Sequence, residues 1–150
     1  MGMMQSLQAS FSGLQVQRAR MNVIAENLAN ASVTRTPEGG PYKPKEIIIA
    51  SQPQRSSFSK LLQSYHNNDQ NNGVREVKVI DIVDVPDAVR MEYDPQHPDA
   101  NSQGYVAYPN ISVLQEMVDL IAASRLYEAN VTAINTAKDM AYRALQIGKV

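Results

Sequence analysis

The sequence contains no cysteine and no tryptophan, and phenylalanine occurs only 2 times in 150 residues. A chain without cysteine forms no disulfide, no thiolate zinc site and no cysteine nucleophile. Because bulky aromatic side chains supply much of the mass of a hydrophobic core, their scarcity indicates an elongated molecule.

Net charge and long apolar runs are missing as well. The 14 basic and 15 acidic residues leave a formal net charge of −1, so nothing attracts nucleic acid or anionic membranes electrostatically. No apolar run approaches the roughly 18 residues that cross a bilayer, and we expect no direct membrane insertion. The first residues, MGMMQSLQASFSG, lack the basic start and apolar stretch of a secretory signal.

What the chain does have is helical periodicity at both ends. In residues 4–30 apolar side chains recur at steps of three and four, interrupted at Arg18, and four of them lie seven positions apart. That is the period of a coiled-coil seam, and so narrow a stripe suits another helix better than a broad core. The helix should end near Asn30, where Thr, Pro and Gly follow. The predicted N-terminal seam consists of Leu7, Phe11, Leu14, Met21 and Leu28.

The C-terminal helix is predicted over residues 111–147, with Ser112 as its N-cap and no Pro or Gly between Asn110 and Gly148. Since isolated helices gain little from propensity alone, two such helices predict pairing with each other and with other chains. The alternative is that both seams are core faces of a monomeric bundle. The predicted C-terminal seam consists of Val113, Met117, Leu120, Tyr127, Val131, Ile134 and Leu145.

The centre of the chain has β-strand character. The segments 45–52 and 74–85 are rich in Val and Ile, and the adjacent Val79 and Ile80 break strict alternation, which indicates a bulge. Asn72–Gly73 is typical of a hairpin turn. Residues 53–65 fit either a helical turn or a short strand.

A second strand region follows Pro86, where Val89, Met91 and Tyr93 should share one face. The expected fold is therefore α+β: long N- and C-terminal helices in a coiled-coil-like pair, with a small antiparallel β unit inserted between them. We expect the chain to divide into helical regions 1–30 and 111–150, an irregular connector 31–44, a β insertion 45–93 and a Pro-rich loop 94–110.

Signs of catalysis are weak. Asp94, His97 and Asp99 lie close together in sequence, but on a Pro-broken segment without a second histidine nearby, so Asx turns are the preferred interpretation over a metal or acid–base site. Gly39–Gly40 lacks the Lys-Ser/Thr that a phosphate loop requires. We predict no catalytic, cofactor-binding or metal-binding residues.

Both ends of the sequence carry recognisable motifs. MNVIAENLANASVTRTPEGGPYKPKEI resembles the N-terminal signature of bacterial flagellar rod and hook axial proteins, and residues 94–149 resemble the C-terminal end of proximal rod proteins of that family. Together the two matches cover most of the helical ends. The motif residues of the resemblance are Asn27, Asn30, Thr34, Tyr42, Asn101, Gly104, Tyr105, Pro109, Asn110, Glu116, Arg125, Tyr127 and Asn130.

The resemblance implies a non-enzymatic structural subunit of the proximal rod, the drive shaft of the flagellar basal body, which transmits torque and forms the wall of the export channel. It implies terminal helices that assemble into a tube, export through the flagellar type III apparatus without a cleaved signal peptide, and a periplasmic location. The implied partners are copies of this chain, other rod proteins, the export gate and ring adaptor proteins.

Two alternatives come from other classes: a cytosolic coiled-coil adaptor, and a periplasmic hydrolase that would use Asp94, His97 and Asp99. Within the rod hypothesis, Asn27 and Asn30 are expected to bond backbone or a neighbouring chain where the helix ends, with simple helix capping as the alternative. The termini should be partly disordered before assembly, because their seams then lack partners.

Overall fold

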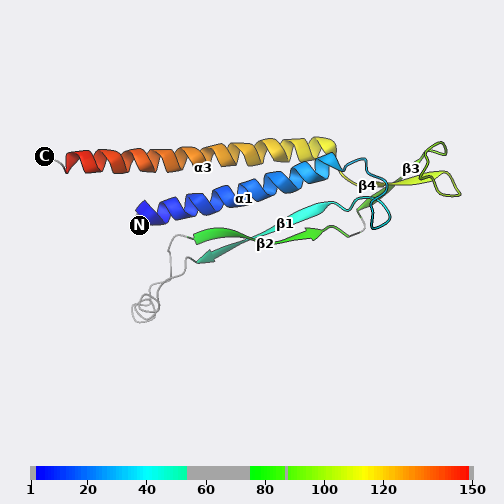
Figure 1. Cartoon of the computed structure of the whole chain (residues 1–150), viewed down its shortest axis with the longest axis horizontal. Coiled ribbons are helices and arrows are strands. Elements are labelled where there is room, and N and C mark those ends of the chain that lie inside the picture. The colour runs from blue at the N-terminus through cyan, green and yellow to red at the C-terminus, as the bar shows by residue number, and fades with distance from the viewer. Residues whose placement is uncertain (1–2, 54–74, 87, 149–150) are drawn as a thin grey trace.

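The structure is a computed structural model that describes residues 3–53, 75–86 and 88–148. Two helices form its long axis: α1, Met3–Ala29, and α3, Val113–Ile147. They run antiparallel and side by side, so that the N-terminus and the C-terminus lie toward the same end (Figure 1). The predicted α+β fold with paired terminal helices is confirmed. No described helix is long and apolar enough to cross a membrane.

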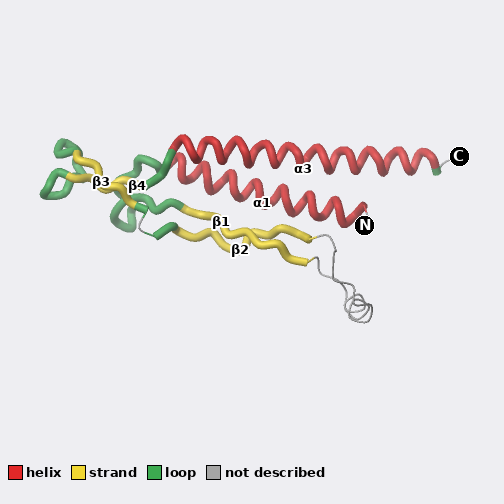
Figure 2. The backbone as a smooth tube through the Cα atoms, turned by 180° about the vertical axis from the view of Figure 1, so that it is seen from behind, coloured by secondary structure: helices red, strands yellow, loops and turns green. Residues whose placement is uncertain are grey.

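The strands form two separate antiparallel pairs. β1, Lys45–Pro53, pairs with β2, Arg75–Asp84, and β3, Val89–Tyr93, pairs with β4, Tyr105–Pro109. The β1–β2 ribbon lies along α1 on the side away from α3, while β3–β4 projects beyond the end of the helices (Figure 2). Helix α1 is therefore the shared middle layer, which contacts α3 on one side and the ribbon on the other.

The predicted bulge in β2 is present. Ile48 pairs with Asp81 and Ile49 pairs with Val79, which leaves Ile80 as the extra residue. A bulge twists and bends the strand locally, as a ribbon laid obliquely along a helix requires. The predicted turn at Asn72–Gly73 and the ambiguous segment 53–65 lie outside the described residues, apart from Pro53.

The prediction of a loop throughout 94–110 is wrong, because Tyr105–Pro109 forms β4. The strand was missed because Pro109 argues against a strand, since proline donates no ladder hydrogen bond. Here Pro109 is the last residue of an outer strand, opposite Val89, where no such donor is needed. The shared face of Val89, Met91 and Tyr93 is confirmed by their pairing with alternate residues of β4.

The hydrophobic core is small. Helix α3 contributes only Ala123 to the fully buried set, and the buried apolar residues of α1, which are Val16, Val23 and Ile24, are not the predicted seam residues. The buried apolar residues of the described chain are Val16, Val23, Ile24, Pro44, Val106, Pro109, Ile111 and Ala123. So few buried residues hold together a long molecule whose surface carries many large apolar side chains.

Candidate functional site

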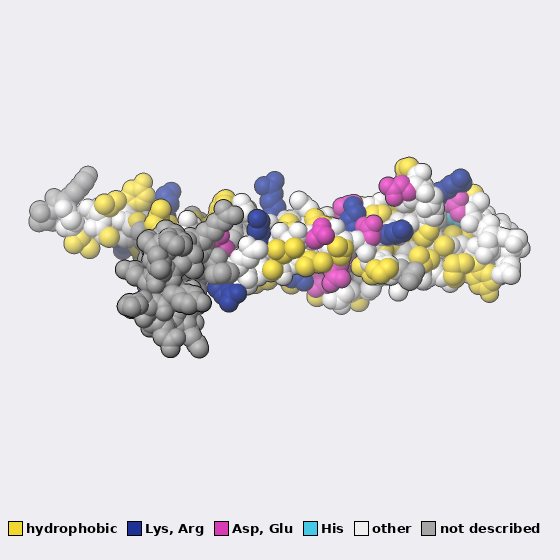
Figure 3. Space-filling view, turned by 90° about the horizontal axis from the view of Figure 1, so that it is seen from below, with side chains coloured by type: hydrophobic (Ala, Val, Ile, Leu, Met, Phe, Trp, Pro, Cys, Tyr) yellow, Lys and Arg dark blue, Asp and Glu magenta, His cyan; other side chains and the backbone are white. Residues whose placement is uncertain are grey.

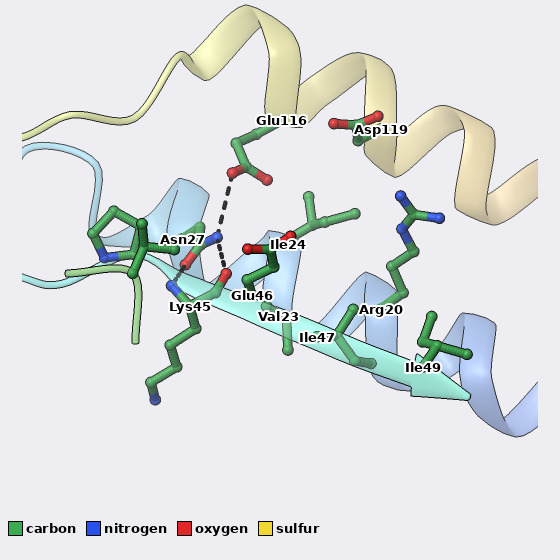
Figure 4. A pocket seen from close by; sticks show the side chains of 12 residues that line it. Arg20, Val23, Ile24, Asn27, Lys45, Glu46, Ile47, Ile49, Glu116 and Asp119 are labelled. Carbon is green, nitrogen blue, oxygen red and sulfur yellow. Dashed lines mark hydrogen bonds between the residues drawn. The ribbon is translucent and has the colours of Figure 1, made fainter. Parts of the chain in front are cut away.

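A hydrogen-bond network centred on Asn27 closes one end of the helix pair. Asn27 lies in the last turns of α1 and is only 4% exposed. Its Oδ1 accepts from the Lys45 backbone N–H at 2.9 Å and from the Tyr42 hydroxyl at 3.1 Å. Its Nδ2 donates to the Lys45 carbonyl at 3.0 Å and to Glu116 Oε1 at 3.3 Å (Figure 4). One buried amide thereby joins α1, the connector, β1 and α3.

The Asn27 amide faces β1 as a neighbouring strand would, because it pairs with both the N–H and the carbonyl of Lys45. All of its donors and acceptors are used, which is the condition for burying a polar group without a large cost. The prediction that Asn27 bonds backbone near the helix end is confirmed. Asn30 follows the simpler alternative, since its Nδ2 donates to the Glu26 carbonyl at 2.8 Å.

We call the place where Asn27 joins α1, the connector, β1 and α3 the junction. Burial, nearby charge and hydrogen bonding shift three pKa values there. Burial is the main cause that raises the pKa of Glu116, opposed by the Asn27 hydrogen bond and assisted by the nearby Asp119. Burial followed by the charge of Glu26 raises the pKa of Tyr42. A hydrogen bond to Glu26 raises the pKa of Lys45, and the two side chains form an ion pair.

The predicted turn residues after β3 serve structural contacts. Asp94 Oδ1 accepts from the Gln96 N–H at 3.1 Å, which is an Asx turn. Asp99 Oδ2 instead accepts from the Thr34 hydroxyl at 2.8 Å and so ties the connector to the β3–β4 loop. His97 Nδ1 accepts from the Asp99 N–H at 3.1 Å. Within the described ranges no three His, Cys, Asp or Glu side chains cluster as metal ligands.

The remaining motif residues of the β3–β4 loop shape its tip. Asn101 Oδ1 accepts from the Gln103 and Tyr105 N–H groups, both at 2.9 Å. Gly104 has φ of 81°, and a Cβ there would lie 2.9 Å from Tyr93 Cε2. The Tyr93 and Tyr105 rings pack edge to face with centroids 5.3 Å apart. Only glycine fits this close, left-handed position.

Two contacts that sequence reasoning missed join the layers along α1. Gly13 lies against Asn130 of α3, since a Cβ at position 13 would be 3.1 Å from Asn130 Nδ2. Ser12 Oγ accepts from the Val77 N–H of β2 at 3.2 Å. A glycine in the middle of a predicted helix costs stability unless packing requires it, and that was the available signal.

Beside the Asn27 network an open groove of about 360 Å³ separates α3 from β1. Its lining mixes apolar and charged side chains, and Arg20 extends from α1 toward α3, where Asp119 lies (Figure 4). The lining residues include Arg20, Val23, Ile24, Glu46, Ile47, Ile49, Glu116 and Asp119.

Large apolar side chains lie exposed on two surfaces. One is the ribbon, where Ile48, Ile80 and Ile82 are exposed and hydrophobic side chains gather along the middle of the face seen in Figure 3. The other is the outer side of α3, where Leu114 is 74% exposed and Ile121 is 60% exposed. Surfaces of this kind are typical of interaction sites.

The predicted seam residues differ in their burial. Most of them are half-buried, and their role in assembly stays a prediction. The half-buried members are Leu7, Leu14, Met21, Leu28, Leu120, Tyr127, Val131 and Ile134. The exposed members are Phe11, Val113, Met117 and Leu145.

The motif residues on and before α3 have separate positions. Pro109 is fully buried, and the Asn110 N–H donates to the Ala88 carbonyl at 2.8 Å. Arg125 is exposed and pairs with Glu128 at 3.6 Å. Tyr127 is half-buried. The structure thus brings Asn27, Tyr42 and Glu116 together, whereas Arg125 lies outside that network.

Comparison with known proteins identifies both ends of the chain. A family model described as "Flagella basal body rod protein" matches residues 7–35, and one described as "Flagellar basal body rod FlgEFG protein C-terminal" matches residues 102–147. These are the segments that contain most of α1 and α3. They place the chain in the class of flagellar basal-body rod proteins.

Similarity to individual proteins extends over nearly the whole chain. The flagellar basal-body rod protein FlgC of Bacillus subtilis (strain 168) is 45% identical over 148 residues, which cover 96% of this chain and 97% of that protein. FlgC of Borreliella burgdorferi is 41% identical over 152 residues, 98% of each chain. FlgC of Escherichia coli O157:H7 is 35% identical over 138 residues, 92% of each. The chain belongs to the FlgC family and is a structural subunit of the flagellar basal-body rod.

Family membership decides against the cytosolic coiled-coil adaptor. It also places the chain in the basal body, among other rod proteins with which it assembles. The relatives are named as rod proteins, which indicates a structural role.

Proposed function

We propose that this subunit belongs to the proximal rod, where its helices form the wall of the export channel and carry torque along the shaft. The observation that supports this proposal is the exposed apolar side of α3, which includes Leu114, Val118 and Ile121. Burying an aliphatic side chain of this size contributes about 1.5–3 kcal/mol. Repeated over many subunits, such contacts stiffen a tube.

The proposal includes a periplasmic position, export without cleavage, and neighbours among copies of this chain, the export gate and ring adaptor proteins. It assigns no enzymatic activity. An uncleaved chain would keep its full mass in purified basal bodies, and mass spectrometry of those particles tests this point. A shortened N-terminus would contradict it.

The assembly proposal is tested by charging the exposed side of α3. Ile121→Asp should abolish swimming and stop growth before the hook, because a carboxylate cannot be buried unpaired at a subunit contact. The protein should still be exported, since the substituted position is exposed in the single chain. Swimming and hook counts by electron microscopy are the measurements.

Ala133→Asp is the matched control, because Ala133 is also exposed on α3 but lies outside the apolar row. It should swim normally. If Ile121→Asp swims as well as Ala133→Asp, the outer side of α3 does not take part in assembly and the proposal fails.

A further inference from the structure

The groove meets one side of α3, and a row of exposed apolar side chains that includes Leu114, Val118 and Ile121 lies on the opposite side of this helix. Glu116, which lines the groove, is two residues from both Leu114 and Val118. At 3.6 residues per turn that spacing places it roughly 160° around the helix from each of them. Both features occupy the first three turns of α3, so they stand at the same height along the long axis.

The row itself is nearly straight. Leu114, Val118, Ile121 and Arg125 follow one another at steps of four, three and four, which aligns them on one side of a helix. The three apolar members are all more than half exposed. We call these four residues the α3 row.

The groove is large enough for the apolar part of the α3 row and offers it apolar contacts. Its volume of about 360 Å³ admits two or three aliphatic side chains, because a cavity of roughly 150 Å³ already holds a benzene molecule. Ile24, Ile47 and Ile49 supply apolar side chains to its lining.

The charges are complementary. The charged residues that line the groove are the basic Arg20 and Lys45 and the acidic Glu46, Glu116 and Asp119. Lys45 is already paired with Glu26, which lies outside the groove lining. The groove is therefore net negative. At the end of the α3 row stands Arg125, whose side chain is 79% exposed. Its surface pair with Glu128 contributes little, so the guanidinium is available to another carboxylate.

We propose that the groove between α1, β1 and α3 receives the α3 row of a second copy of this chain, with Leu114, Val118 and Ile121 against the groove lining and Arg125 beside Asp119. This inference rests on the proposed function and names the neighbour and the surfaces. Because the donor and acceptor surfaces differ and lie on opposite flanks, the contact is heterologous. Contacts of that kind repeat around an axis into a ring or an open helix, the geometry of a tube wall.

Disulfide cross-linking in assembled basal bodies tests the proposal. Because this chain has no native cysteine, every disulfide that it forms uses an introduced cysteine. Ile49→Cys marks the groove and Val118→Cys marks the row. Cells that produce both single variants should give a disulfide-linked dimer after mild oxidation. A chain that carries both substitutions should give dimers, trimers and higher species. Neither single variant alone should cross-link.

The other outcomes each have a meaning. A dimer from Val118→Cys alone would show a symmetric row-to-row contact and overturn the inference. Cross-linking of Ile49→Cys to the control Ala133→Cys with equal yield would overturn it, as would capture of a different rod protein in place of this chain. Variants present in basal bodies but never linked would refute the inference alone. Absence of the unmodified chain from basal bodies would refute the proposed function itself.

A charge reversal covers the case in which the cysteine variants do not assemble. Arg125→Glu and Asp119→Arg should each reduce swimming, because each places like charges together at the contact. The double variant should restore swimming, because the pair is re-formed in the opposite orientation. A double variant that swims no better than the worse single variant would overturn the inference.

Discussion

At the end of the helix pair where β1 begins, Asn27 connects four segments through hydrogen bonds, whereas at the other end α3 continues beyond α1 with its side chains uncovered. Gly13 lies against Asn130 and Asn27 against Glu116, so α1, which begins at Met3, ends opposite Met140. The exposed apolar side chains of the last turns are Met140, Tyr142, Leu145 and Ile147.

The difference shows which parts of the subunit are complete in a single chain. At the junction, all four hydrogen-bonding positions of the buried Asn27 amide are used by this chain's own groups. At the open end, the apolar surface has no partner among the residues that the structure describes, so we expect neighbouring subunits to stabilise it. The junction should therefore govern the stability of the subunit, and the open end should govern its assembly.

The largest effect on stability is expected from Asn27→Leu. This change leaves the N–H and carbonyl of Lys45 and the carboxylate of Glu116 without their partner, at an expected loss of about 2–4 kcal/mol in the free energy of unfolding. Urea denaturation of the purified chain measures it. Asn30→Leu is the matched control, since it removes a single bond to a helix carbonyl and should cost less than about 1 kcal/mol. Equal losses would mean that the Asn27 network does not stabilise the junction.

A smaller effect is expected midway between the two ends. Gly13→Leu forces a side chain into the space of Asn130, and overpacking of this kind typically costs about 1–3 kcal/mol. The combination with Asn130→Ala makes room and should recover part of the loss. A gain in stability from Gly13→Leu alone would show that helix propensity outweighs the close approach, and would contradict the observed packing.

The parts that the sequence predicted correctly depend on neighbours in the chain. Apolar periodicity gave α1 and α3 to within two residues, Ser112 caps α3 as expected, and the adjacent Val79 and Ile80 predicted the bulge. Each of these signals lies within one element. These predictions are confirmed because the tertiary packing of these elements agrees with their local preferences.

The parts that were missed depend on distant contacts. The buried face of α1 contains Val16 and Val23 and not the predicted seam, because α1 packs on α3 and the ribbon at once. The motif singled out Asn27, but its partners Lys45 and Glu116 are 18 and 89 residues away in sequence. No local pattern specifies such a pairing. The strand β4 was missed because its pairing with β3 outweighs the weak propensity of Pro109.

Very little effect on the isolated chain is expected at the open end. Leu145 is 68% exposed, so Leu145→Asp should change the free energy of unfolding by no more than about 0.5 kcal/mol. The same variant should fail to restore swimming to cells that lack this subunit, since the charged side chain then enters a subunit contact. Amide exchange in the dilute chain should be fast beyond Met140 and slow around Val23. Strong protection of the last turns would contradict the division between a complete and an incomplete end.

The smallest effect tests the electrostatics of the junction through pH. Because burial raises the pKa of Glu116 in the folded chain, the folded state binds more protons than the unfolded state between the unfolded and the raised pKa. The contribution of this carboxyl to stability is therefore present at low pH and decreases as the pH rises through that interval. In Glu116→Gln, the amide oxygen still accepts the hydrogen bond from Asn27, but the side chain cannot ionise. The free energy of unfolding of this variant should therefore fall less than that of the unsubstituted chain as the pH rises from the acid side of the interval to neutral. Glu38→Gln is the control, because Glu38 is exposed and lies outside the Asn27 network. An unchanged pH profile in Glu116→Gln would show that the carboxyl is as well solvated in the folded chain as in the unfolded one.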